Sequence, residues 1–518
     1  MSVFNKRSRT DNSIKTSFVS TSTLLLKIFM GFFYRSMFLR ILSSAYLGIN
    51  GLFSNVLQIL TLAELGITGA IVYRFYEPIS KDDIVQVGKI MNYFKKVYRT
   101  IAVIILSLGL ALLPFIHLLI NDEGEIPGDI NLQLVYVLFL LNSVATYLYA
   151  YKLSLLTADQ RHYNVALVDL IVTALKYGLQ MVMLLLTHNY TLTLVVGIFA
   201  TLLCNFTASM WVTKQYKEVF EVKETLSKEE TKSIMADTRA TMYHKIGNTV
   251  LNGTDNAVLT KMVSLTATGL YSNYSLIIMY IQNFVSQLMG NLTSSIGNAS
   301  QIMAKDEFYW LYKKINFVCL SVTSIIVTGC YTCIDDFISV WVGKEYLLSK
   351  WTTLVICIQL YINLSRTINS SFINATGLFV KDRIRPLIES VLNLVISILL
   401  VKEIGITGVF LGTIISLGLT AFWREPYLLY KHVFKTSFFD YWKRYLSFIL
   451  LTAWDILIMI FLKSLVPGLE RNILYFLAEG SLSVIISVFF ISLVMRKKEE
   501  MSFLKGLAGK VVSKITKR

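Results

Sequence analysis

Hydrophobic runs of about twenty residues recur along almost the whole chain and are separated by short polar segments. Each run is long enough to cross the ~30 Å hydrocarbon core of a bilayer as an α-helix. The runs lack the two-residue alternation of barrel strands, so helices are the elements that can satisfy their backbone there. We predict an all-α integral membrane protein with about 14 transmembrane helices. The spans lie near 18–41, 44–73, 100–120, 132–151, 164–187, 191–213, 241–262, 267–299, 315–334, 351–373, 386–401, 404–423, 445–463 and 472–495.

The basic residues follow this plan. Lys and Arg concentrate in alternate loops and in both terminal segments. Because cytoplasmic loops of membrane proteins are rich in positive charge, these basic loops and termini are predicted to lie on the cytoplasmic side. The opposite loops carry only a few basic residues, namely Lys344, Lys350, Lys402, Lys463 and Arg471. The N- and C-termini are therefore predicted to be cytoplasmic, and a cleaved signal peptide is not expected.

An internal repeat divides the chain. The motif Gly51-Leu-Phe-Ser-Asn55 opens the second span, and Gly269-Leu-Tyr-Ser-Asn273 opens the eighth, 218 residues later. Two six-helix lobes, related by a parallel pseudo-symmetry, are the simplest interpretation, with two C-terminal helices added. We predict an N-lobe over 1–222 and a C-lobe over 223–438 that begins with an amphipathic linker. Residues 439–518 would hold the last two spans and a basic cytoplasmic tail that could lie on anionic lipid.

Composition fits a membrane protein. The 518 residues are 54% hydrophobic and only 16% charged, against about a quarter charged in soluble proteins. The net charge of +16 falls between the spans, so it indicates topology and lipid contact and not nucleic-acid binding. Phosphate-loop, zinc-protease and nucleophile-elbow motifs are absent from the sequence, and its five histidines are dispersed. We therefore expect no enzyme, no cofactor and no metal site.

Ionisable residues inside the spans are the candidate functional residues, because burying a charge in a bilayer is costly. Cations outnumber acids and concentrate in the first span of each lobe. If those spans flank a central cavity, the cavity would attract a phosphate or pyrophosphate. The candidate cavity cations are Lys27, Arg35, Arg40, Arg74, Lys245, Lys261 and Arg366. Those near span ends could instead reach the headgroups.

Three acids could couple an ion or pair with these cations. They are Asp169, Asp255 and Glu389. Arg366 could pair with an acid such as Glu389 instead of facing a cavity. Asp169 and Glu389 are 220 residues apart and occupy corresponding places in the two halves of the repeat. Both lie near span ends, where the positive end of a helix dipole could simply stabilise an acid.

Three segments resemble Wzx-type polysaccharide flippases of the multidrug/oligosaccharidyl-lipid/polysaccharide (MOP) exporter superfamily. They are Tyr46-Leu-Gly-Ile-Asn-Gly-Leu-Phe-Ser-Asn55, Glu64-Leu-Gly-Ile-Thr-Gly69 and Leu155-Leu-Thr-Ala-Asp-Gln-Arg161. The resemblance implies a V-shaped two-lobed bundle that works by alternating access. It implies a polyprenyl-pyrophosphate-linked oligosaccharide as substrate, a bacterial plasma membrane, and a polysaccharide polymerase and glycosyltransferases as partners. Analogy with lipid II flippases would make the last two spans a groove for the prenyl tail, although Asp455 does not suit an apolar groove.

Two other classes compete with this interpretation. A multidrug or cation-coupled antiporter of the same superfamily would favour an acidic cavity, against which the basic excess argues. A membrane polysaccharide polymerase or ligase would be expected to carry a large external loop, whereas the predicted outside loops are short.

Overall fold

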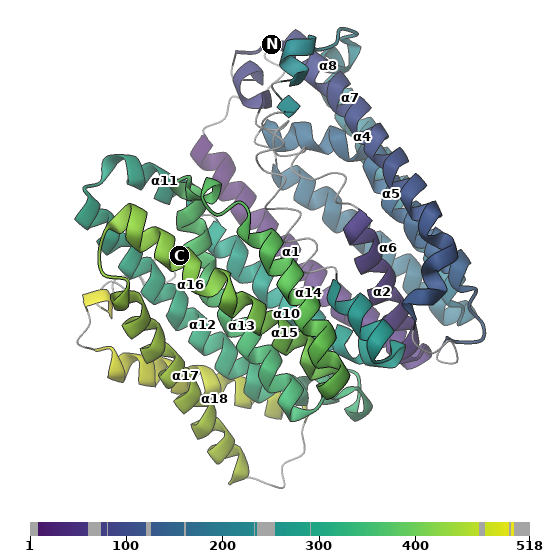
Figure 1. The fold of residues 1–518 in the computed structure, drawn as a ribbon. Helices are drawn as coiled ribbons and strands as arrows, with labels where there is room; N and C mark the ends of the chain where they lie inside the picture. Colours follow the sequence, from purple (N-terminus) through teal and green to yellow (C-terminus); the bar gives the residue numbers. More distant parts are fainter. Residues whose placement is uncertain are drawn as a thin grey trace. The chain divides into compact units, whose positions relative to one another are not determined.

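The computed structural model describes residues 9–60, 74–79, 81–120, 126–159, 162–232, 234–235, 254–290, 292–465, 472–496 and 499–501. Throughout these residues the chain is helical, without a strand (Figure 1). Eight helices within the described part are long and apolar enough to cross a membrane. The predicted all-α membrane class is therefore confirmed. The segments 61–73 and 241–253 of the second and seventh predicted spans, and the tail 502–518, lie outside the described residues.

Packing divides the chain into two compact units, Met1–Gly269 and Leu270–Arg518. The lobe limits at 222 and 438 stay a prediction. The helices of the first unit are α1 (Arg9–Ile41), α2 (Ser44–Leu60), α4 (Ile84–Leu112), the 3₁₀ helix η2 (Leu113–Leu119), α5 (Leu132–Ala158), α6 (His162–Thr187), α7 (Tyr190–Gln215) and α8 (Lys217–Glu221). Helix α10 (Leu265–Gly290) begins in this unit and continues into the second.

The second unit continues with a series of membrane helices and short connecting turns (Figure 1). They are α11 (Thr293–Ile302), α12 (Lys305–Trp341), η4 (Lys344–Tyr346), α13 (Lys350–Ala375), η5 (Leu378–Val380), α14 (Arg385–Ile404), α15 (Ile406–Leu419), α16 (Ala421–Leu428), the π-helical turn η6 (Leu429–Phe434), α17 (Phe439–Ser464) and α18 (Ile473–Val494). The predicted eighth span is thus two helices, α10 and α11, and the twelfth comprises α15 and part of α16.

Polar caps fix several helix starts. The side chain of Asn131 accepts a hydrogen bond from the backbone N–H of Leu134 at 3.0 Å, and Asn189 caps α7 in the same way. Ser349 and Asn472 cap α13 and α18. Each cap satisfies a backbone donor that the first helical turn leaves free. The observed starts therefore fall within a residue or so of the predicted ones.

The linker that follows residue 222 contains a capping box. The backbone N–H of Ser227 donates to Glu230 Oε2 at 2.8 Å, and the backbone N–H of Glu230 donates to Ser227 Oγ at 3.2 Å. Gln86 at the start of α4 donates to the other carboxylate oxygen of Glu230 at 2.8 Å. These bonds, first of all that from the Ser227 backbone, lower the pKa of the Glu230 carboxyl. The linker is therefore attached to α4.

The starts of α2 and α10 lie side by side in the first unit. A Cβ added to Gly269 would lie 2.1 Å from the backbone oxygen of Ser44, and one added to Gly48 would lie 2.2 Å from that of Leu265. Such approaches are open only to glycine. The first turns of α2 and α10 therefore pack backbone to backbone, which gives a physical reason for glycine at positions 48 and 269.

Candidate functional site

The basic first helix of the first unit contacts an acid that belongs to the candidate set. Lys27 on α1 forms an ion pair with Asp169 on α6, and both side chains are partly exposed. Arg40 in the last turn of α1 is exposed. Arg35 lies near the stacked rings of Tyr34 and Tyr177, whose centroids are 4.8 Å apart. Helices α1 and α6 thus bring together one cation and one acid that the sequence placed in separate spans.

The other candidates of the first unit differ from this pair in their exposure and contacts. Lys261 is exposed and donates to the backbone oxygen of Ile120 at 3.4 Å. Asp255 has one carboxylate oxygen, Oδ1, that is buried without a hydrogen-bond partner. Arg74 is partly exposed in the short helical segment 74–79. Lys245, the repeat mate of Lys27, lies outside the described residues.

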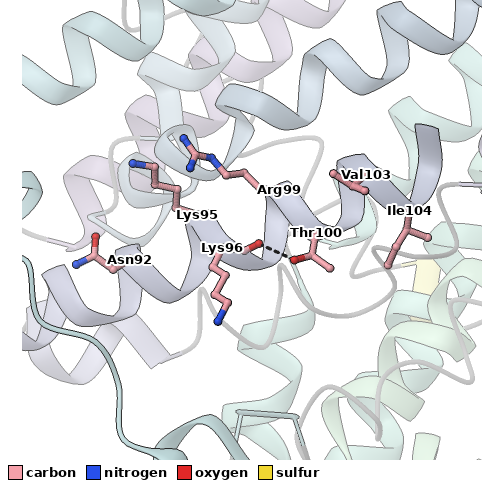
Figure 2. A pocket seen from close by; sticks show the side chains of 7 residues that line it. All are labelled: Asn92, Lys95, Lys96, Arg99, Thr100, Val103 and Ile104. Carbon is pink, nitrogen blue, oxygen red and sulfur yellow. Dashed lines mark hydrogen bonds between the residues drawn. The ribbon is translucent and has the colours of Figure 1, made fainter. Parts of the chain in front are cut away.

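The first unit also contains a basic pocket that the sequence analysis did not single out. It measures about 490 Å³ and is lined by one face of α4, from Asn92 to Ile104. Lys95, Lys96 and Arg99 supply three positive charges, and Figure 2 shows Lys95 and Arg99 projecting to the same side of the helix, one turn apart. These three cations form no ion pair with any described residue. The pocket therefore carries uncompensated positive charge.

The charged end of this pocket continues into an apolar surface. Val103 and Ile104 line the pocket one to two turns further along α4, and their side chains are 62% and 40% exposed. Thr100 lies between the two parts and donates its hydroxyl to the backbone oxygen of Lys96 at 3.0 Å (Figure 2). One helix face thus offers cations followed by apolar side chains. This order suits a ligand with an anionic head and an apolar tail.

In the second unit, charged side chains form a buried network. The guanidinium of Arg366 on α13 donates to both carboxylate oxygens of Glu425 on α16, at 2.5 and 3.2 Å. Arg385, at the start of α14, contacts Glu389 at 2.5 Å, Asp382 at 2.6 Å and Glu425 at 3.3 Å. Arg366 therefore pairs with Glu425, and Glu389 pairs with Arg385.

This network is electrically balanced. Arg424 donates to Asp382 at 3.0 Å and completes a set of three guanidiniums and three carboxylates. The carboxylate side chains are at most 4% exposed. Because each buried charge has a partner, the network is suited to holding α13, α14 and α16 together and not to binding a free anion.

A second basic pocket adjoins that network. It measures about 550 Å³, and Lys381, Arg383, Arg385 and Arg424 supply its cations beside the apolar Ile384, Ile388 and Trp423. Arg385 and Arg424 are engaged with acids, as described above. Within the described residues, Arg383 forms no ion pair, and Lys381 approaches only the ring of His432, at 3.4 Å. This pocket therefore has less free positive charge than the one on α4.

The sequence analysis missed these features for identifiable reasons. Glu425 falls just beyond the predicted twelfth span, and Lys95, Lys96 and Arg99 were counted only as signs of a cytoplasmic loop. Helix α4 begins at Ile84, well before the predicted span, so the three cations belong to a continuous helix. The four-residue spacing of Lys95 and Arg99 was the available signal, since such residues share a helix face.

No protein-family model matches the sequence, and no curated protein matches it. Solved structures share its fold. The lipid II flippase MurJ in an inward closed conformation is similar over 92% of this chain and 99% of its own, with a TM-score of 0.67 and 16% sequence identity. An inward-facing multidrug resistance MATE family transporter of the MOP superfamily is similar over 77% of this chain and 94% of its own, with a TM-score of 0.58 and 14% identity.

An outward-facing MATE family transporter of the MOP superfamily is similar over 80% of this chain and 93% of its own, with a TM-score of 0.54 and 14% identity. These neighbours are transporters. The chain is therefore a multi-pass membrane protein with the fold of MOP superfamily transporters. At such identities the likeness defines the fold and leaves the substrate to be argued from the residues.

Proposed function

We propose that this protein is a flippase that moves a polyprenyl-pyrophosphate-linked oligosaccharide across a bacterial plasma membrane by alternating access. Its substrate would be an anionic, amphiphilic lipid used in capsule, O-antigen or exopolysaccharide assembly. In this proposal the N- and C-termini are cytoplasmic, glycosyltransferases act before the flippase, and a polysaccharide polymerase acts after it.

The observation that carries the proposal is the basic pocket on α4. Its three cations lack acidic partners among the described residues, and the predicted topology puts them at the cytoplasmic side, where a lipid-linked precursor would enter. Lys and Arg bind phosphate through charge-assisted hydrogen bonds. Exposed Val103 and Ile104 could contact the first isoprene units while the pyrophosphate lies against Lys95 and Arg99.

Among the candidates of α1, Lys27 is the weaker anion ligand, because Asp169 already neutralises it. Arg35 and Lys245 remain proposed cavity cations. Arg366 has a structural partner in Glu425, which argues against a direct contact with substrate. We therefore place the first contact with the pyrophosphate at α4 and any later contact at α1.

The second candidate function, a multidrug or cation-coupled antiporter, has a specific observation in its favour. Asp255 is a partly buried acid with a free carboxylate oxygen, which is a group that could bind an organic cation. The α4 pocket argues the other way, because a cationic drug would be repelled by Lys95, Lys96 and Arg99. The anionic substrate is therefore the better supported one.

The test is leaflet transfer of a labelled polyprenyl-pyrophosphate oligosaccharide in vesicles that contain the purified protein. The Lys95→Ala, Lys96→Ala, Arg99→Ala triple variant should weaken substrate binding. At about 1 kcal/mol for each solvated phosphate contact, the loss is about 3 kcal/mol, or roughly a hundredfold in the apparent substrate affinity. High salt should weaken wild-type binding in the same direction.

A matched control removes the same charge elsewhere. Lys344, Lys350 and Lys402 are exposed and lie on the predicted opposite side of the membrane, so their triple Ala variant should transfer substrate like wild type. An equal loss of substrate affinity in both triple variants would mean that the cations of α4 act only through the net charge of the protein and form no binding site. Unchanged affinity in the α4 variant would reduce Lys95, Lys96 and Arg99 to contacts with anionic lipid headgroups.

A further inference from the structure

The last two membrane helices pack on the second unit with their polar sides inward. Helices α17 and α18 contact each other, and both lie against α12 (Figure 1). On α18 the buried residues are Glu479, Ser483, Ser487 and Ile491, each four positions after the last. Leucine, isoleucine, valine and phenylalanine side chains cover the outer face of the same helix. Lipid-facing positions are therefore apolar, and the polar residues are directed at neighbouring helices.

Helix α12 presents a matching polar face. Ser324, Thr328, Thr332 and Asp336 recur at intervals of four and are all buried. Gly329 leaves room for α18 to approach, because a Cβ there would lie 3.2 Å from the Ser483 hydroxyl. We call the polar faces of α12, α17 and α18 together the polar seam.

One end of the polar seam holds two acids and one lysine. Lys463 of α17 forms ion pairs with Asp336 of α12 and with Glu479 of α18, the latter at 2.9 Å. It also donates to the backbone oxygen of Thr332 at 3.1 Å. The Oε2 atom of Glu479 is buried and accepts no hydrogen bond from a described residue. One ammonium group therefore serves two buried carboxyls.

Two turns further into the membrane lies a third acid, Asp455 of α17. Its side chain is fully buried, and neither carboxyl oxygen has a hydrogen-bond partner among the described residues. The Ser487 hydroxyl of α18 lies beside it and is also buried. Further along the seam, the hydroxyls of Ser324 on α12 and Thr452 on α17 are 2.7 Å apart.

Among the described residues of the seam, Asp455 is the acid without a basic partner. Lys463 forms ion pairs with Asp336 and Glu479, whereas Asp455 forms none. Among the described residues, the other ionisable side chains near this region include Cys333 of α12, a thiol, and Tyr361 of α13, a phenol near Thr452. Asp335 of α12 instead bonds to Tyr274 and Thr353. A buried, unpaired carboxylate takes up a proton more readily than it remains charged.

We propose that the polar seam is a proton-binding site in which Asp455 takes up and releases a proton. In the protonated state the Asp455 hydroxyl donates to Ser487, and α17 and α18 stay packed on α12. Release of that proton to water leaves a bare carboxylate between these helices, which loosens their packing. Proton exchange would thereby act on the helices that flank α12. The coupling to transport rests on the proposed function, whereas proton binding does not.

The site also explains why α17 and α18 do not enclose a wholly apolar groove. Their facing sides bear Asp455, Lys463, Glu479 and two serines, and they are directed at α12. A prenyl tail would meet the apolar outer faces of these helices and not the polar seam.

Infrared difference spectroscopy of the purified protein in lipid nanodiscs, titrated from acidic to alkaline pH, tests proton binding directly. Wild type should lose a carboxylic-acid carbonyl band on alkalinisation, and Asp455→Asn should lack that band. Glu403→Gln, which changes an exposed acid at the end of α14, should leave the band in place. A band that persists in Asp455→Asn would overturn the proposal. A carboxyl of Asp455 that does not titrate would also overturn it, because the residue would then be a permanent hydrogen-bond donor.

The coupling is tested in vesicles with an imposed pH gradient. Wild-type transfer of labelled polyprenyl-pyrophosphate oligosaccharide should accelerate severalfold with the gradient, whereas Asp455→Asn should retain its basal rate and lose the acceleration. An Asp455→Asn rate that still follows the gradient would contradict the coupling. If wild type transfers no substrate, the proposed function fails, and the infrared band still decides the proton site.

Discussion

Removing one charge from the buried network of the second unit should destabilise the protein more than removing any exposed charge. The network pairs three guanidiniums with three carboxylates. Glu425→Gln keeps the shape of the side chain and deletes one negative charge. The guanidinium of Arg366, which contacts the two carboxylate oxygens at 2.5 and 3.2 Å, then loses its counter-charge and one of these two acceptors, while only 13% of its side chain is exposed.

Glu425→Gln should lower the free energy of unfolding because it leaves a buried positive charge without its counter-charge. Breaking a buried ion pair typically costs about 3–5 kcal/mol. With about 2–4 °C of melting temperature for each kcal/mol in a unit of this size, the expected loss is about 6–20 °C. Replacing both partners, as Arg366→Met with Glu425→Leu, removes two opposite charges, leaves the remaining network neutral, and should recover most of this loss.

Thermal unfolding in detergent, followed by tryptophan fluorescence, measures both variants. Glu403→Gln is the matched control, because Glu403 is exposed and forms no ion pair with a described residue. It should melt like wild type. A Glu425→Gln variant as stable as this control, or a double variant no better than the single one, would refute the reasoning.

Three further outcomes follow from the first unit. Gly269→Ala should lower the melting temperature, since its Cβ would lie 2.1 Å from the backbone oxygen of Ser44 and overpacking costs about 1–3 kcal/mol. Lys27→Asp should reduce stability, and adding Asp169→Lys should restore it, because the exchanged pair again joins opposite charges. Because the pKa of Glu230 is lowered in the folded protein, its ionised carboxyl stabilises the fold above the ordinary pKa of a glutamate, and this stability is lost as the pH falls through the lowered pKa. Spin-label distances from the linker to α4 should therefore broaden only in acid.

Most of the helices could be predicted from local patterns in the sequence. The twenty-residue apolar runs predicted an all-helical membrane protein, and polar caps such as Asn131 and Asn189 explain why several ends fall near their predicted positions. The capping box at Ser227 was readable because its two side chains are three residues apart and act locally. The repeated glycine motif was visible too, although its reason, the close contact of Gly269 with Ser44, needed coordinates.

Pairing between distant helices could not be read from the sequence. Lys27 and Asp169 are 142 residues apart, and nothing local connects them. Arg366 could have paired with any acid that reached it, and packing of α13 against α16 selects Glu425. The polar seam was missed for a different reason. The spacing of Glu479, Ser483 and Ser487 is visible in the sequence, but only contacts show that this face is directed at α12.

The central claim is that the transported head is anionic. Leaflet transfer by wild-type protein, measured for a labelled polyprenyl-pyrophosphate oligosaccharide in competition with inorganic pyrophosphate and with a lipophilic organic cation, tests it most directly. We predict transfer of the labelled lipid, slowed by pyrophosphate and indifferent to the cation, because Lys95, Lys96 and Arg99 attract the former and repel the latter. Transfer of the cation itself, with no movement of the lipid-linked sugar, would contradict the account.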